Sequence, residues 1–214
     1  MSPTRVYPLW THCSLAGANA YLIKVANGFV LVDTGFVWSW KRLRLVVLTH
    51  GDVDHAGNAA RLRRGYRAAI AVHRGDLPAV ERGVIPRRAS VGLLAKAVGL
   101  LGRIIVALRR GAFETFVSDL VLEDGQSLDE HGLAAKIIHI PGHTKGSIAI
   151  LTADGSPYSG DTLFNMKHPP LFVENLDEFK ASLAKLRSIQ EQVTRVYPGH
   201  GKSFPGAAIG RMEV

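Results

Sequence analysis

The chain has 214 residues, of which 47% are hydrophobic, so the composition excludes a disordered protein and permits a sizeable core. The formal net charge of +8 favours an anionic substrate, nucleic acid or an acidic membrane surface without selecting one of them. A single cysteine, Cys13, excludes an internal disulfide and a thiolate metal site. The length predicts one domain over 1–214, and the absence of a signal-peptide pattern at the start predicts a cytoplasmic protein.

Strand patterns dominate residues 5–35. Two apolar runs, 20–25 and 29–32, flank Asn27 and Gly28, and this spacing predicts a β-hairpin. The second run ends at Asp33. An aspartate at the end of a strand is often only a cap or a turn former, so this position alone leaves the role of Asp33 open. The short basic stretch 36–44 leaves room for a turn or two of helix.

The loop 49–58 has the highest density of potential metal ligands in the chain. It follows the apolar run 45–48, which predicts a buried strand, and loops at the carboxyl ends of strands are where open α/β sheets bind ligands. In an extended loop, alternation would direct three of the ligands to one side and the fourth to a second point a few Å away. The alternative is a polar turn with accidental histidines, and four ligands in six residues argue against it. These four residues are His50, Asp52, Asp54 and His55.

The next segments continue the alternation of helix and strand. Residues 58–65 predict a helix that ends at Gly65, and 68–73 predict a strand with His73 at its end. We expect His73 to be structural rather than a metal ligand.

The stretch 76–116 interrupts this pattern with a helical basic and apolar insertion. Apolar residues recur at helical spacing through 90–110, interleaved with Lys96, Arg103 and further arginines. The charges argue against a membrane span. We expect an amphipathic helix or a broken helical pair that is a lid over the site, a dimer surface, a packed helix or a membrane-surface helix.

After the insertion, strands are predicted at 116–117, 120–122, 135–140, 147–151 and 193–197, and a further strand ends within 158–162. An amphipathic helix is predicted at 176–188. Three of these strands lead into glycine-containing loops that carry His143, Asp161 and His200. Histidine and carboxylate ligands gathered at one sheet edge suit a pair of Zn, Fe or Mn ions.

These motifs, in this order and over residues from about 15 to 202, resemble the metallo-β-lactamase superfamily. The resemblance implies a four-layer αββα sandwich and a dinuclear centre in which Asp161 bridges the two metals. It also implies that Asp33 supports the ligands from behind. By this resemblance the first metal would take His50, Asp52, His143 and Asp161, and the second would take Asp54, His55, Asp161 and His200.

Two features depart from the family pattern. The usual loop is His-x-His-x-Asp-His, and here Asp52 replaces the second histidine. A carboxylate at this position favours Fe or Mn relative to a three-imidazole zinc site, and the flavodiiron branch of the family carries a glutamate there. The family usually has a helix where this chain has the short stretch 35–45, which affects the packing of one face rather than the metal site.

The residues and the resemblance together predict a dinuclear metal-dependent hydrolase. A metal-bound hydroxide would attack a small-molecule ester, thioester, lactone or phosphodiester, and Asp54 would orient the nucleophile and shuttle its proton. His168, Lys167 and Lys202 are candidates for binding a substrate anion, although surface residues are the simpler interpretation.

Two other classes of protein remain as alternatives. A flavodiiron-type redox enzyme is weakened because the chain has no room for a flavodoxin-like domain. A nucleic-acid-binding nuclease is weakened because the positive charges are scattered and no aromatic stacking surface is evident. Nucleic acid is therefore not the expected partner, whereas a homodimer is compatible with the sequence.

Overall fold

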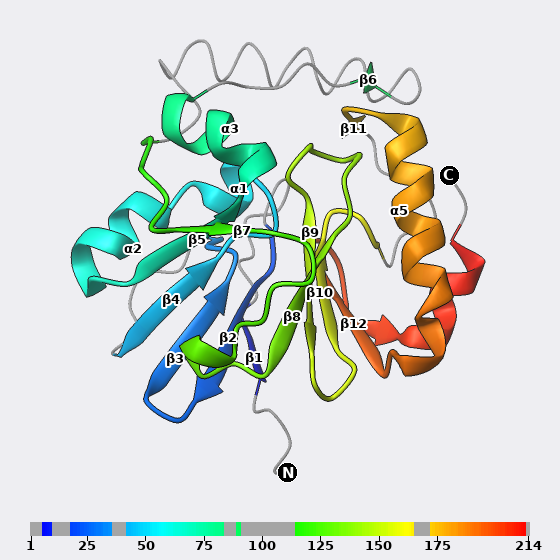
Figure 1. The fold of residues 1–214 in the computed structure, drawn as a ribbon, viewed down its shortest axis with the longest axis horizontal. Helices are drawn as coiled ribbons and strands as arrows, with labels where there is room; N and C mark the ends of the chain where they lie inside the picture. The colour runs from blue at the N-terminus through cyan, green and yellow to red at the C-terminus, as the bar shows by residue number, and fades with distance from the viewer. Residues whose placement is uncertain are drawn as a thin grey trace.

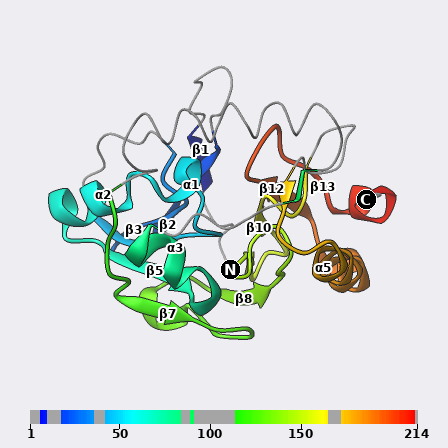
Figure 2. The same cartoon turned by 90° about the horizontal axis from the view of Figure 1, so that it is seen from above.

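The structure is a computed structural model that describes residues 6–9, 18–35, 42–83, 89–90, 114–164 and 172–212. Two β-sheets face each other, and helices cover their outer faces (Figure 1). Seen from above, α2 and α5 lie on opposite sides of the pair of sheets (Figure 2). The predicted layered α/β fold is confirmed. Among the described residues, no helix is long and apolar enough to cross a membrane.

The first sheet begins with the predicted hairpin and continues as parallel strands. β1, β2 and β3 are antiparallel, and β3, β4, β5 and β7 run parallel. Gly28 makes the hairpin turn possible, because its φ is +147° and a Cβ there would lie 2.3 Å from the Arg42 carbonyl oxygen. In spatial order the strands are β1 (Val6–Leu9), β2 (Ala20–Val25), β3 (Gly28–Val32), β4 (Leu43–Val47), β5 (Ala69–His73) and β7 (Leu120–Leu122).

The second sheet is built from the C-terminal half of the chain. β10 and β12 are parallel, and the other neighbours are antiparallel. In spatial order its strands are β13 (Phe204–Pro205), β12 (Arg195–Pro198), β10 (Pro157–Gly160), β9 (Ile148–Thr152) and β8 (Ala135–His139). A separate two-stranded sheet joins β6 (Ala89–Ser90) to β11 (Phe172–Val173).

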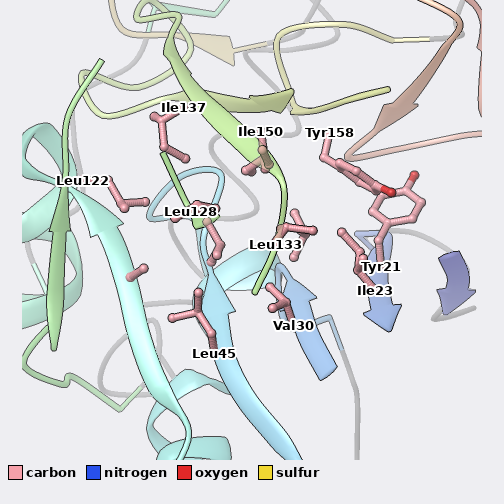
Figure 3. Packing of buried hydrophobic residues seen from close by; sticks show 14 of the residues in the cluster. Tyr21, Ile23, Val30, Leu45, Leu122, Leu128, Leu133, Ile137, Ile150 and Tyr158 are labelled. Atoms are coloured by element: carbon pink, nitrogen blue, oxygen red, sulfur yellow. The ribbon is translucent and has the colours of Figure 1, made fainter. Parts of the chain in front are cut away.

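Apolar side chains fill the described core in three layers. One layer lies between the first sheet and its helices, α1 (Val53–Ala56), α2 (Ala59–Tyr66) and α3 (Leu77–Arg82). The middle layer lies between the two sheets (Figure 3). The third packs the second sheet against α5 (Leu176–Ser188). Short 3-10 helices complete the described elements at Arg74–Asp76, Asp129–His131, Gln190–Gln192 and Gly206–Arg211.

The strand directions bring several carboxyl ends to one edge of the molecule. β3 leads to Asp33 and β4 leads to His50 in the first sheet. In the second sheet, β8, β10 and β12 lead to His143, Asp161 and His200. This edge is where the two sheets jointly carry the candidate site.

Three local expectations were wrong. α2 does not end at Gly65 but continues to Tyr66, because Arg67 adopts the left-handed conformation that closes the helix, with a φ of +55°. Residues 116–117 form no strand, and β7 begins at Leu120. The extended loop expected after His50 is instead interrupted by α1. The helix expected at 90–110 and most of 36–44 lie outside the described residues.

Candidate metal centre

The loop after β4 turns through one helical turn, and this turn separates its ligands into two groups. Asp52 is the extended residue before α1, with φ −73° and ψ 150°, and its side chain makes no cap hydrogen bond to the helix. Asp54 and His55 lie within α1. The turn therefore groups Asp54 with His55 rather than with His50. The alternation of an extended loop predicted that Asp54 would share a side with His50 and Asp52, and this prediction was wrong.

Two clusters of potential ligands lie next to each other. In each cluster the ligand atoms lie within 4.8 Å of one another. Asp52 adjoins the first cluster, because its Oδ2 lies 3.2 Å from His143 Nε2 and 3.5 Å from His50 Nε2. The first cluster contains His50, His143 and Asp161, and the second contains Asp54, His55 and His200.

Asp161 lies between the clusters. Its Oδ1 is 3.3 Å from His55 Nε2, and its Oδ2 is 3.3 Å from His200 Nε2 and 3.7 Å from His143 Nε2. All seven residues expected to ligate metal are thus brought together, with Asp161 in the central place that the family resemblance implies.

Asp33 fixes the orientation of two histidines from behind. Its Oδ2 accepts hydrogen bonds from His55 Nδ1 at 2.8 Å and from Thr49 Oγ1 at 2.7 Å, and its Oδ1 accepts one from the Thr49 backbone N–H at 2.7 Å. Because Thr49 gives its only hydroxyl proton to Asp33, His50 Nδ1 must donate to Thr49 Oγ1, 3.0 Å away. Both rings therefore turn their Nε2 atoms toward the centre.

His143 is oriented by the separate two-stranded sheet. Its Nδ1 donates to the Phe172 carbonyl oxygen at 2.9 Å, so its Nε2 faces Asp52 and Asp161. Phe172 lies in β11.

Among the ligand residues, three buried atoms make no hydrogen bond, namely His50 Nε2, His55 Nε2 and Asp161 Oδ1, and the last two lie 3.3 Å apart. Buried polar atoms are normally paired, so nitrogen and oxygen atoms that converge in this way fit a positively charged partner. A cluster of imidazole nitrogens and carboxylate oxygens fits Zn, Fe or Mn.

Asp161 and the charged groups of the second cluster shift one another's pKa values strongly. Burial disfavours the charged form of Asp161, but the neighbouring His55 and His200 overcome this effect and hold its pKa well below the usual range. Burial likewise lowers the pKa of His200, whereas Asp161 and Asp54 raise it to about 10. Without metal, protons on the histidines supply the positive charge that the carboxylates require.

Sequence reasoning missed two residues that hold the ligand loops. Asn19 Nδ2 donates to the carbonyl oxygens of Pro198 at 3.0 Å and Gly201 at 2.7 Å, on either side of His200. Asp76 contacts the loops of both His50 and His143. Their partners are distant in sequence, so no local pattern marks either residue.

Of the remaining candidates, His73 and Lys202 lie among the described residues, and neither belongs to the two clusters. His73 stacks on His139 with ring centroids 4.0 Å apart, as expected of a structural histidine. Lys202 is exposed, and Lys167 and His168 lie outside the described residues.

A family model described as the metallo-beta-lactamase superfamily matches residues 14–200. A hydroxyacylglutathione hydrolase of Pelagibacter ubique is 26% identical over 159 residues, which are 74% of this chain and 52% of that protein. The chain thus spans about half the length of this curated relative.

Solved structures share the fold. The protein TTHA1623, crystallised in a di-iron-bound form, superposes with a TM-score of 0.67 and 25% identity, over 96% of this chain and 97% of that one. The B3 metallo-beta-lactamase BLEG-1 superposes with a TM-score of 0.71 and 21% identity, over 95% of each chain.

Proposed function

Because the chain belongs to the metallo-beta-lactamase superfamily, we propose that it is a metal-dependent hydrolase with a dinuclear centre that cleaves small-molecule thioesters. The observation that carries the proposal is the convergence from two sheets of buried nitrogen and oxygen atoms of His50, His55 and Asp161 that make no hydrogen bond. The thioester class is supported by the hydroxyacylglutathione hydrolase relative.

The proposed ligands divide between two metals. His50, Asp52 and His143 would hold the first, and Asp54, His55 and His200 would hold the second, with Asp161 shared between them. When bound, such a pair of cations acidifies water and stabilises an oxyanion. The carboxylate at Asp52 adds a hard, charged oxygen donor, which supports iron or manganese at the first site.

Asp54 is the proposed base. Its Oδ2 lies 3.3 Å from His200 Nε2 and 3.9 Å from His55 Nε2, and the positive charge of His55 helps to keep its pKa low despite burial. Asp54 would orient the attacking water and accept its proton. The water oxygen adds to the thioester carbonyl carbon, the carbon–sulfur bond breaks, and the proton passes to the departing thiolate.

The test combines metal analysis with hydrolysis of a panel of substrates. Protein purified without chelator is expected to carry close to two Zn, Fe or Mn ions and to release thiol from acyl-glutathione thioesters faster than it cleaves lactones or phosphodiesters. Asp161→Ala should lose both metal and hydrolysis.

Asp119→Asn is the matched control, because Asp119 bonds Arg63 and the Ile70 backbone away from the site. This variant should keep metal and hydrolysis. A metal-free protein that retains full activity would refute the metal dependence, and a metal-loaded protein that prefers phosphodiesters would refute the substrate class.

A further inference from the structure

Asp76 is a buried carboxylate that joins the two ligand loops of the first cluster. Its side chain is 3% exposed, and it lies at the end of the short 3-10 helix Arg74–Asp76 that follows β5. Its Oδ2 accepts hydrogen bonds from the Gly51 backbone N–H and from Thr144 Oγ1, each at 2.8 Å. Its Oδ1 accepts one from the Gly146 backbone N–H at 2.8 Å.

The positions of these donors connect Asp76 to the ligands. Gly51 directly follows His50, and Thr144 directly follows His143. His50 comes from the first sheet and His143 from the second, so one carboxylate ties together the two sheets immediately behind two ligands of the same cluster. A hydrogen bond to a carboxylate is stronger than a hydrogen bond between two neutral groups, and Asp76 accepts three of them.

The loop that carries Asp76 packs closely against the loop that follows His143, so neither backbone can shift far. A Cβ at Gly146 would lie 2.5 Å from Asp76 Cγ, and a Cβ at Gly75 would lie 2.6 Å from the Lys145 carbonyl carbon. The backbones on the two sides therefore need glycine at both positions.

The second cluster is held by other residues. His55 is oriented by Asp33, and the loop of His200 is held by Asn19 and Tyr21. We propose that Asp76 is a positioning residue that sets the spacing of His50 and His143, so that affinity at the first metal site depends on it and affinity at the second does not. The inference rests on the proposed metal centre.

The test is titration of the metal-free protein with Zn²⁺ against a chromophoric chelator, which yields both affinities without an activity assay. Asp76→Asn keeps the shape of the side chain but loses its charge and one acceptor oxygen. We expect one of the two affinities to fall about 10–100-fold, as when partners behind metal ligands are lost, while the other stays unchanged.

A His143→Ala background identifies the affected site. In a His143→Ala protein the first site has already lost a ligand, so the affinity that remains intact belongs to the second site, and Asp76→Asn should leave that affinity unchanged. Thr144→Val removes only one donor and should weaken the same site by less, which keeps the test available if Asp76→Asn fails to fold. Asp119→Asn, a structural carboxylate near the other end of β5, should leave both affinities intact.

The outcomes separate this inference from the proposed function. Wild-type affinities in Asp76→Asn and Thr144→Val, or equal losses at both sites, would overturn the positioning role. A wild-type protein that binds two metals but hydrolyses no thioester would overturn the proposed substrate class and leave the positioning role standing.

Discussion

Three of the proposed ligand histidines each use one ring nitrogen to hold the ring in place. The Nδ1 atoms of His50, His55 and His143 bond Thr49, Asp33 and the Phe172 carbonyl oxygen, respectively. Rings tethered in this way cannot rotate away from the centre, and the tether also fixes which nitrogen carries the proton. The site is therefore organised before any metal arrives.

Asp33→Asn tests this tether. The amide can no longer accept from Thr49 and His55 as the carboxylate does, so both His50 and His55 lose their fixed orientation. We expect metal affinity to fall about 10–100-fold and the free energy of unfolding to fall by about 1–3 kcal/mol. Chelator competition and urea denaturation measure the two effects.

Asp154→Asn is the control for this change, because Asp154 accepts a hydrogen bond from Thr152 in an exposed turn after β9. It should keep wild-type metal affinity. Unchanged metal binding in Asp33→Asn would show that the tether is dispensable.

Asp52 distinguishes this loop from the commoner family pattern. Its side chain lies 3.2 Å from His143 Nε2 and does not cap α1, so the structure favours ligation over helix capping. Asp52→Ala is expected to lose metal at the first site with little change in stability. Asp52→His should retain two metals and shift preference toward zinc, since imidazole replaces a hard oxygen donor. Elemental analysis after loading with a mixture of metals measures the metal content and the metal preference of both variants. Two metals at full occupancy in Asp52→Ala would contradict ligation by Asp52.

The ligand loops could be read from the sequence because their residues have distinctive chemistry at the ends of apolar runs. Asn19 and Asp76 could not be read in this way. Their partners are backbone atoms and a hydroxyl that lie up to 182 residues away in the chain, and no local pattern encodes such a contact.

At the scale of elements, the His143 loop is seated on the first turn of α5. The Gly142 carbonyl oxygen accepts hydrogen bonds from the Glu174 and Asn175 backbone N–H groups. Asn175 Oδ1 in turn accepts from the backbone N–H groups of Asp177 and Glu178, so the helix start and the ligand loop form one unit.

Gly142→Ala should disturb this unit. Gly142 has a φ of +126°, and a Cβ there would lie 2.3 Å from the Phe179 backbone nitrogen. We expect the free energy of unfolding to fall by more than the roughly 1–3 kcal/mol of backbone strain alone, together with weaker metal binding at the first site.

Gly125→Ala separates strain from collision. Gly125 also has a positive φ, +76°, but nothing lies within 4 Å of the Cβ position. This variant should lose stability and keep its metals. Thermal unfolding and zinc titration measure stability and metal affinity. Equal losses of both in Gly142→Ala and Gly125→Ala would contradict the packing of the His143 loop against α5.

Long elements were predicted better than short ones. The helix predicted at 176–188 matches α5, because thirteen residues suffice for an apolar periodicity to show. α1 has four residues, too few for any period, so the loop was expected to be extended and alternation directed Asp54 to the wrong side, whereas the family resemblance placed it with His55. The end of α2 depends on a left-handed arginine, which sequence patterns do not favour.

At the scale of the whole molecule, the charge of the centre links folding to pH. The pKa of His200 is raised to about 10 and that of His55 is raised well above its ordinary value, chiefly by carboxylates that outweigh burial. Groups with a raised folded-state pKa stabilise the protein fully below their unfolded pKa of about 6.5, and this contribution disappears as pH rises.

The metal-free protein should therefore lose free energy of unfolding between about pH 6.5 and 10. Saturating zinc should remove this loss, because the metal replaces the protons as positive partner. His200→Gln should reduce the slope in the metal-free protein. Urea denaturation across this range measures both effects, and a metal-free stability that rises toward pH 10 would contradict the assignment.

The sheet order was not predictable from apolar runs, which locate strands but do not say how they pair. The layered fold was expected from the family resemblance, and the three apolar layers of the described core agree with it. Because the proposed ligands come from both sheets, metal affinity at the centre depends on how the two sheets pack against each other.

The distance along the chain between the residues of the centre has a consequence for synthesis. Asp33 and His55 emerge from the ribosome long before His200 and the loop that Asn19 holds. Contacts of such long sequence separation form late in folding. A nascent chain can therefore present only part of the proposed ligand set, and the full set exists only after the second sheet has packed against the first.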